Sequence, residues 1–578
     1  MYRQMLDPIG HSLGLSSIAA AVPLLALFVL LGVFRLRAWV ASLISLVVAL
    51  LVAVVIYPMP ASQALLAGSD GAAFGFFPIL WIVINAIWIY EMTVETGHFD
   101  VLRRSFAKVS DDQRIQGVII AFSFGALLEA LAGFGSPVAI TSVMLIALGF
   151  RPLKAATVAL VANTAPVAFG ALAVPITTLA TVTHLSQSHL GATVGRQTPL
   201  LGVFVPIALV FIIDGRRGVR QTLPAVLVTG ITFAVAQFVV SNYISVELTD
   251  IVASLLSAAT TVAFLRVWRP VEVYTEAAEP AVVGAGMSSG PASTSGGTGS
   301  TSARTGGSGG NGGQGGPAAA EEYRIRDRDA HDSRADVARA YAPYVVIIVV
   351  FALAQLSGIK NLLDKPTRML HWPGLHILSA SGKVSTLPVF KLDWLDASGT
   401  LLIIAGLITI PILRIAPRRA LAAYVLTYRK LASAIITVMA VLALAYVMNS
   451  SGQTITLGTW MAGAGGLFAV LSPILGWIGV AVTGSDTSSN SLFGALQVTA
   501  AGKAGLSPLL LAAANSSGGV LGKMISPQNL AIGAAAVGLS GQEGDLFRRV
   551  FKWSLLFVAF MCVVIYLQST SVLSWMLP

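Results

Sequence analysis

Long runs of apolar residues, separated by short polar segments, make up most of this 578-residue chain. Apolar stretches long enough to form a membrane-crossing helix recur from end to end; examples are 14–34, 38–57, 74–90 and 551–567. About 18 or more such residues cross a hydrocarbon core about 30 Å thick. The pattern therefore predicts an all-α polytopic membrane protein.

Basic residues fall in alternate connecting segments, which sets the topology. The loops 59–70, 181–197, 241–247 and 450–456 are nearly free of Lys and Arg, whereas the intervening segments are rich in them. Cytoplasmic loops carry the excess of Lys and Arg, so we place the basic segments inside. The alternation predicts about twelve transmembrane helices with both termini outside. The first span has no small-residue cleavage site, so we interpret it as a retained helix rather than a signal peptide.

Two segments, 117–150 and 457–501, do not fit as simple crossings. Each consists of two apolar arms joined at a polar, glycine-containing break, and the charge pattern returns each to its starting side. These features predict two re-entrant hairpins, since irregular backbone at membrane depth is tolerated only inside protein or beside a wet cavity. Each hairpin precedes an apolar segment with a polar interruption, at 155–181 and 506–538, which we expect to be a broken helix.

The order of hairpin and broken helix occurs twice, in opposite orientations, as is typical of an inverted-repeat transporter. We place the first repeat at 14–220, connecting helices at 222–267 and the second repeat at 340–570. Between them, 270–339 is rich in Gly and Ser and is predicted to be a disordered cytoplasmic linker, because it cannot bury apolar surface. The segment 358–398 reads as an ordered outer loop.

Composition narrows the functional classes. The net charge of +10 lies mainly in the connecting segments, so it indicates topology and not a nucleic-acid partner. The single cysteine, Cys562, excludes an intramolecular disulfide framework and thiolate metal clusters. Neither an HExxH nor a GxSxG motif lies within a predicted span, and no helix has paired deep carboxylates, so we expect neither an enzyme nor a cofactor or metal site. Inverted hairpins favour a closed midplane site over a continuous channel.

Three ionisable side chains are predicted to lie deep in the membrane: Glu129, Asp486 and Lys523. Such groups are costly there and mark ion or substrate pathways. Burial disfavours the charged form of a carboxylic acid, so Glu129 is the first candidate for binding the coupling proton and Asp486 the second. Two alternatives stay open: Glu129 as a purely structural acid, and a neutral pair formed by Asp486 and Lys523.

Polar residues around the breaks are predicted to bind an anionic substrate. Helix ends exposed at 133–137 and 516–519 would present N–H groups and a positive dipole to a carboxylate, and Lys523 is the only deep cation. The alternative is that these small residues simply allow close helix packing. The predicted substrate-binding residues are Gly135, Ser136, Asn163, Thr164, Ser485, Thr487, Ser488, Asn490, Asn515, Ser516, Ser517 and Lys523.

The motifs "LLEALAGFGSPVAI", "NTAPVAFGALAVPI", "TGSDTSSNSLFGALQV" and "NSSGGVLGKMISPQNLAI" closely resemble the L-lactate permease family of bacterial membrane transporters. The resemblance is specific over 115–180 and 457–555. It implies proton symport of L-lactate, D-lactate and glycolate across the bacterial cell (inner) membrane by elevator-type alternating access. The expected partners are a small monocarboxylate and the lipid bilayer, with a homodimer left open. The alternative is Na⁺-coupled carboxylate symport, with Na⁺ bound by oxygens of "GSDTSSNS" and the breaks.

Overall fold

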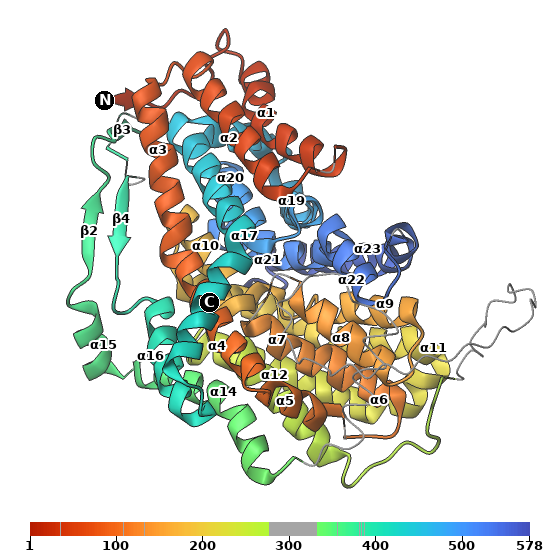
Figure 1. Cartoon of the computed structure of the whole chain (residues 1–578). Helices are drawn as coiled ribbons and strands as arrows, with labels where there is room; N and C mark the ends of the chain where they lie inside the picture. The colour runs from red at the N-terminus through yellow and green to blue at the C-terminus, as the bar shows by residue number, and fades with distance from the viewer. Residues whose placement is uncertain are drawn as a thin grey trace, which may run out of the picture.

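The computed structural model describes residues 1–34, 36–107, 109–131, 133, 135–276, 332–354, 356–380, 382, 384–385, 388–540 and 542–578. Within these residues, nine helices are long and apolar enough to cross a membrane, or ten if one bent pair counts as a span. The described chain is mostly helical, as the apolar pattern predicts (Figure 1). The helix α11 (Gln187–Tyr243) has 57 residues and a non-helical bend at Gly215, so it supplies two halves of crossing length.

One group of helices gathers around α17 (Pro417–Ser451), which packs against α2, α3 and α4 and also contacts α20 of the second predicted hairpin. In Figure 1, α3 and α17 run side by side. The other members of this group are α1 (Leu13–Gly32), α2 (Ala38–Val55), α3 (Ala61–Phe74), η1 (Gly75–Leu80), α4 (Trp81–Glu95), α5 (His98–Ala107), α14 (Arg334–Ala354), α16 (Ser398–Leu413) and α18 (Gln453–Met461).

The segment predicted as the first hairpin forms two helical arms. The second arm, α8 (Ser136–Ala147), has 12 residues, which span only about 18 Å and cannot cross the hydrocarbon core. Gly135, just before α8, has a φ of 85°, a left-handed conformation that glycine adopts at little cost. The first arm is wholly buried and runs through α6 (Gln113–Gly117), η2 (Val118–Phe124) and α7 (Gly125–Leu131).

The first broken helix is bent by 65° between α9 (Pro152–Ala162) and the segment made of η3 (Val167–Phe169) and α10 (Gly170–Thr183). The interruption begins at Asn163, as predicted. Inside α10, the three residues Ala171–Ala173 have φ values of 45°, 55° and 59°. Left-handed backbone costs about 1–2 kcal/mol for each such residue. Strain of this kind is retained mainly at functional sites.

The segment predicted as the second hairpin, 457–501, covers the end of α18 and two longer helices, α19 (Phe468–Thr483) and α20 (Asp486–Ala504). Between α18 and α19 lies a 3₁₀ turn, η4 (Ala462–Leu467), which Gly465 interrupts with a φ of 55°. The residues from α18 through α19 together form one candidate membrane span, Gln453–Thr483.

The second broken helix is interrupted further along than predicted. The helix α21 (Pro508–Gly519) stays regular through the predicted break at 516–519, and the interruption is the 3₁₀ segment η5 (Val520–Ile525). A new helix, α22 (Pro527–Ala536), then starts at a proline, which is favoured at the first helical turn. The free helix end therefore belongs to α22.

The two halves of the chain contact each other through their broken helices. The second part of each one packs against a helix of the segment predicted as the other half's hairpin: α10 packs against α20, and α22 packs against α8. The connecting helix α12 (Thr249–Phe264) packs against α11 and α7, and α23 (Glu543–Gln568) packs against α19. A short turn, η6 (Ser574–Met576), follows α23.

The outer segment 358–398 is ordered in the parts that the structure describes. It contains α15 (Ser357–Asp364) and two small sheets. One sheet pairs β2 (Arg368–His371) with β4 (Val389–Leu392) in antiparallel fashion, and the other pairs β1 (Tyr2–Arg3) with β3 (Ile377–Leu378) in parallel.

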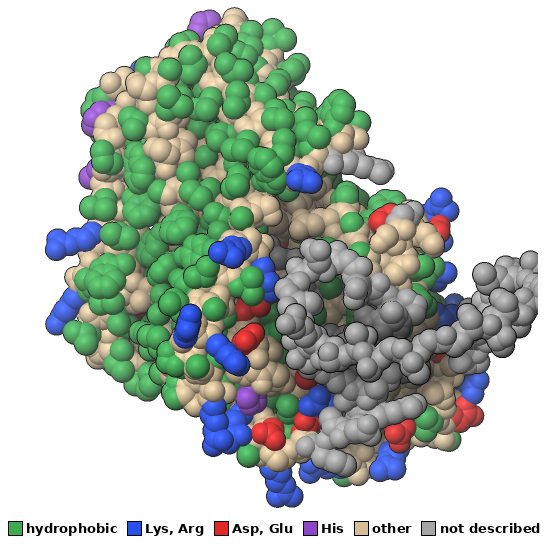
Figure 2. Space-filling model, in the orientation of Figure 1, with side chains coloured by type: hydrophobic (Ala, Val, Ile, Leu, Met, Phe, Trp, Pro, Cys, Tyr) green, Lys and Arg blue, Asp and Glu red, His purple; other side chains and the backbone are tan. Residues whose placement is uncertain are grey.

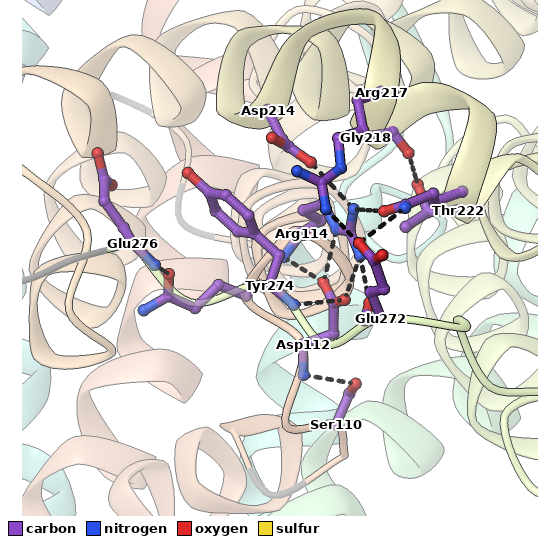
Figure 3. A network of polar contacts seen from close by, with 12 residues as sticks. Ser110, Asp112, Arg114, Asp214, Arg217, Gly218, Thr222, Glu272, Tyr274 and Glu276 are labelled. Carbon is purple, nitrogen blue, oxygen red and sulfur yellow. Dashed lines mark hydrogen bonds and ion pairs between the residues drawn. The ribbon is translucent and has the colours of Figure 1, made fainter.

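Both ends of the predicted linker are ordered, which corrects the prediction that all of 270–339 is disordered. The buried Arg114 donates hydrogen bonds to Asp112, to Asp214 and to the backbone oxygen of Glu272 (Figure 3). The hydrogen bond from Arg217 lowers the pKa of Glu272. Charge pairs hold these flanks, and composition alone did not show them.

The far end of the linker is held in the same way. Asp332 forms an ion pair with Arg104, with 2.5 Å between Oδ1 and Nη2, and α14 begins two residues later. The centre of the predicted linker, 277–331, lies outside the described residues, so its disorder stays a prediction.

Hydrophobic and basic side chains separate on the surface. In Figure 2 hydrophobic side chains cover most of the upper part of the visible face, while Lys and Arg gather toward its lower edge. This separation agrees with an apolar surface that faces lipid and with a basic side, as the charge pattern predicts.

Candidate functional site

A buried ion pair joins the two halves of the molecule. The Lys523 Nζ lies 2.5 Å from the Glu129 Oε1, and both side chains are almost fully buried. The Asn163 amide donates to the other carboxylate oxygen, Oε2, at 2.9 Å. Glu129 comes from the first hairpin, Asn163 from the first broken helix and Lys523 from the second. The alternative pairing of Lys523 with Asp486 is therefore wrong in this structure.

The backbone around the ion pair is shaped to admit the carboxylate. A Cβ atom added to Gly170 would lie 2.9 Å from the Glu129 Oε1, closer than real Cβ contacts allow. The strained turn Ala171–Ala173 follows directly. The close approach requires glycine at 170, and the turn brings the start of α10 to the acid.

The second predicted acid, Asp486, is held by neutral groups. Its Oδ2 accepts hydrogen bonds from the Ser516 hydroxyl at 2.5 Å and from the Asn490 amide at 3.3 Å. Its Oδ1 is buried and has no hydrogen-bond partner. Asp486 is the first residue of α20, so the positive end of that helix dipole lies beside it. One acceptor oxygen of this acid therefore remains open to a further donor or cation.

Both acids face one cavity of about 640 Å³. Its volume is in the range of small-molecule sites. Among its lining residues are Glu129, Asp486 and Lys523. Helix α17 contributes Ser433 and Thr437, which the sequence did not indicate. The wall also includes Leu36 and Arg37, which are exposed.

The predicted substrate-binding residues divide into three groups. Ser485, Thr487, Ser488 and Lys523 line the cavity. The second group donates hydrogen bonds to the two acids: Asn163 to Glu129, and Asn490 and Ser516 to Asp486. The remaining predictions do not line the cavity: Gly135, Thr164, Asn515 and Ser517, together with Ser136, whose side chain lies outside the described part of the structure.

Two residues of the third group make other buried contacts. Asn515 donates to the Asn490 Oδ1 at 2.9 Å, and Ser517 donates to the Gln197 Oε1 at 2.6 Å. Thr164 donates only to the backbone of its own turn, at Val161. The packing alternative therefore describes Thr164 better than a binding role does.

Sequence reasoning missed two deeply buried acids. Asp70 and Asp250 are both fully buried, although the sequence placed neither among the three deep ionisable residues. Both stand at or near the predicted outer loops 59–70 and 241–247. The helix α3 starts at Ala61, inside the predicted loop 59–70, whereas α12 starts at Thr249, just after the predicted loop 241–247. The sequence signal that could have indicated these buried acids was a carboxylate inside an apolar run or next to one.

Several buried amides were missed as well. Gln197, Gln237 and Gln497 are fully buried and hydrogen-bonded to other side chains. An amide within an apolar helix must find a partner, because an unpaired buried polar group costs about 1–3 kcal/mol. Glutamine inside an otherwise apolar run was the available signal.

Many crossing helices around a buried polar cavity, with an ion pair that joins its two sides, are the arrangement of a multi-pass membrane transporter. The sequence profile of the L-lactate permease family matches residues 16–572. The chain belongs to the L-lactate permease family. It is accordingly a permease and not an enzyme, and a multi-pass protein of the bacterial cell (inner) membrane.

Curated relatives match over nearly their whole length. The chain is 41% identical to the glycolate permease GlcA of Escherichia coli K12, over 98% of each chain. It is 38% identical to the L-lactate permease of Bacillus subtilis 168 and 40% identical to that of E. coli K12, over the full length of all the chains. Among solved structures, Neisseria gonorrhoeae MtrF aligns over 87% of this chain and 82% of its own, with 12% identity and a TM-score of 0.45.

Proposed function

We propose that this permease takes up L-lactate and the related 2-hydroxy acids D-lactate and glycolate together with a proton. The observation that carries the proposal is the buried ion pair between Glu129 and Lys523. The substrate class is supported by relatives whose names are L-lactate permease and glycolate permease.

The ion pair explains coupling through the net charge of the site. Without substrate, Glu129 and Lys523 neutralise each other. A substrate carboxylate at Lys523 adds one negative charge, which a proton on Glu129 removes. An unpaired charge at the membrane centre costs about 2.5–3.5 kcal/mol or more. The empty site and the site with both ligands are therefore favoured over a site with only one.

The geometry allows this exchange to occur in place. Protonation of Glu129 removes the charge that holds Lys523 at 2.5 Å, so the ammonium becomes free for a substrate carboxylate. The hydroxyls of Ser485, Thr487 and Ser488 line the same cavity and are suited to the 2-hydroxyl group.

We infer that alternating access follows the inverted-repeat layout, with about twelve crossings, two re-entrant hairpins and elevator-type movement. Support comes from α8, which is too short to cross, and from the packing of α10 and α22 on each other's hairpins. The cavity wall reaches the exposed Leu36 and Arg37 on the basic side. On this proposal, the described conformation is the one open toward the cytoplasm.

The test is Glu129→Gln in proteoliposomes. Glutamine keeps the shape of a protonated acid but cannot release a proton, and it leaves Lys523 unpaired whenever substrate is absent. We expect uptake driven by a pH gradient to be lost, while exchange of labelled for unlabelled lactate persists. Glu129→Asp should retain coupling. If Glu129→Gln still concentrates lactate, the proton binds elsewhere; loss of both uptake and exchange would mean a structural acid.

Sodium coupling is the second candidate, because one specific observation favours it. The buried Asp486 Oδ1 has no hydrogen-bond partner, and Ser485, Thr487 and Ser488 place hydroxyl oxygens around the same cavity. Oxygen ligands of this kind suit a hard cation. Uptake driven by an imposed Na⁺ gradient at equal pH on both sides would support this candidate over proton coupling.

A further inference from the structure

Asp250 is a fully buried acid that the proposed exchange at Glu129 does not use. It lies in the first turn of α12, immediately after the outer loop. Its Oδ1 accepts one hydrogen bond, from the Gln237 amide at 2.9 Å, and its Oδ2 has no partner. One amide is little compensation for a buried carboxylate. The environment therefore favours a bound proton over a permanent charge.

Glu129 is the buried acid on a helix that packs against α12. That helix is α7 (Gly125–Leu131), which carries the Glu129 carboxylate. The other elements packed on α12 are η2 and α10, which have no ionisable side chain, and α11. On α11, Arg196 is bonded to Asn242 and to a backbone oxygen near the C-terminus, and Tyr243 is exposed.

The remaining ionisable groups on α11 lie away from Asp250. His189 is exposed near the start of the helix, and Asp214 with the basic residues Arg216, Arg217 and Arg220 flanks the bend at Gly215 on the basic side. In the loop before α12, Glu247 bonds to Ser245 and to Gln187. Two neighbouring buried carboxylates disfavour double ionisation. Protonation of one carboxylate therefore makes ionisation of the other easier.

The helix α11 has buried polar side chains near both Asp250 and the cavity. The Gln237 Nε2 donates to Asp250, and the Gln237 Oε1 accepts a hydrogen bond from Thr198 at 3.2 Å. Gln197, also on α11, accepts from Ser517 of α21 at 2.6 Å, and Ser516 of α21 donates to Asp486. All these side chains are buried, and α11 packs against α21.

We propose that Asp250 is a second proton-binding residue, which relays protons between the outer loop at 244–248 and Glu129. This inference rests on the proposed proton coupling. In each cycle the Asp250 carboxylate takes a proton from water at the outer side and passes it to the Glu129 carboxylate. Asp250 is then ionised again and ready for the next proton, so the relay adds no proton to the overall stoichiometry.

The test compares Asp250→Asn with Asp70→Asn in proteoliposomes. Asparagine has the shape of aspartic acid but binds no proton. We expect Asp250→Asn to slow pH-driven uptake by about tenfold or more, to leave lactate exchange unchanged, and to be rescued by Asp250→Glu. Asp70 is the matched control: it is also fully buried and both its carboxylate oxygens lack a hydrogen-bond partner, but it lies on α3, which packs against α17.

The outcomes separate a relay from a structural role. Unchanged uptake in Asp250→Asn would overturn the proposal, because the acid would then be permanently protonated. Equal loss of uptake and exchange, or an equal effect of Asp70→Asn, would also overturn it.

A second measurement does not depend on substrate. Infrared difference spectra of the purified protein at high and low pH should contain a carboxylic acid carbonyl band that Asp250→Asn removes. A spectrum identical to that of the unsubstituted protein would contradict proton binding at Asp250. If the unsubstituted protein transports neither lactate nor glycolate, the proposed function fails, yet this measurement still decides whether Asp250 binds a proton.

Discussion

The two broken helices share a spacing of residues but differ in backbone and in chemistry. Asn163, Gly170 and Pro175 in the first half have the same spacing as Asn515, Gly522 and Pro527 in the second. Ala171 consequently occupies the place that Lys523 has in the second half. The asparagines also differ, since Asn163 donates to Glu129 whereas Asn515 donates to Asn490. Both segments therefore have a polar break, but only the second break contains a basic residue, Lys523.

The acids of the two hairpins differ accordingly. Glu129 has a cation on one carboxylate oxygen and an amide on the other. Asp486 has two neutral donors on one oxygen and none on the other. Glu129 is thus neutralised by Lys523, a cation that can bind a substrate carboxylate instead. Asp486 has no such ion-pair partner in the described structure. Because of this difference we assign proton coupling to Glu129 rather than to Asp486. Substitutions around the two acids can test the assignment.

The largest effect is expected for Lys523→Ala, which removes the cation that pairs with Glu129 and so removes the main difference between the two acids. Losing the charged partner of a substrate carboxylate should raise the apparent KM for lactate by roughly tenfold to a hundredfold. Pumping against a gradient should also fail, since Glu129 no longer has a cation to release. Lys523→Arg keeps the charge and should lose less. Concentration-dependent uptake measures both variants, and an unchanged KM in Lys523→Ala would remove this residue from the binding site.

A smaller loss is expected when a methyl group is placed against either acid. A Cβ at Gly170 would lie 2.9 Å from the Glu129 Oε1, and one at Gly519 would lie 2.4 Å from the Asp486 Oδ1. Each alanine must displace its carboxylate, and misplacing a reacting group by about 1 Å costs up to about a hundredfold in rate.

If the two acids differ as proposed, Gly170→Ala should reduce pH-driven uptake more than exchange. Gly519→Ala should instead reduce both processes together. Parallel uptake and exchange assays distinguish these patterns, and the reverse order would assign the coupling role to Asp486.

A moderate effect is expected for Asp486→Asn. The amide oxygen can still accept the Ser516 hydrogen bond, so binding should weaken by only several-fold, in line with about 1 kcal/mol for one altered hydrogen bond. Uptake driven by a pH gradient should persist. Complete loss of gradient-driven uptake, with the protein still folded by a thermal-melt control, would favour the sodium candidate or a proton site at Asp486.

The smallest effect is expected for deletion of 284–316 between the halves. The structure holds the two ends of the predicted linker independently, through Arg114 with Glu272 and through Arg104 with Asp332. Transport should therefore remain close to normal at equal surface expression. A clear loss of uptake at normal expression would show that the connection itself takes part in transport.

The sequence predicted the positions of the breaks better than their contacts. Glycine and proline interrupt apolar runs locally, so the breaks near Gly135 and Asn163 lie where the pattern indicated. The break after Ser516 was placed too early, because small polar residues there remain helical through Gly519. Whether such a stretch stays helical depends on the elements packed around it, which hydropathy does not include.

By itself, the sequence determined that the chain is a mostly helical, multi-pass membrane protein and that its helices break near Gly135 and Asn163, because hydropathy and helix breakers act over neighbouring positions. Only the tertiary structure decided which acid receives the cation. Glu129 and Lys523 are 394 positions apart, and their contact exists because the two halves interlock. The burial of Asp250 was decided in the same way: α7 and α11 enclose the start of α12, and no local pattern reports how distant helices pack.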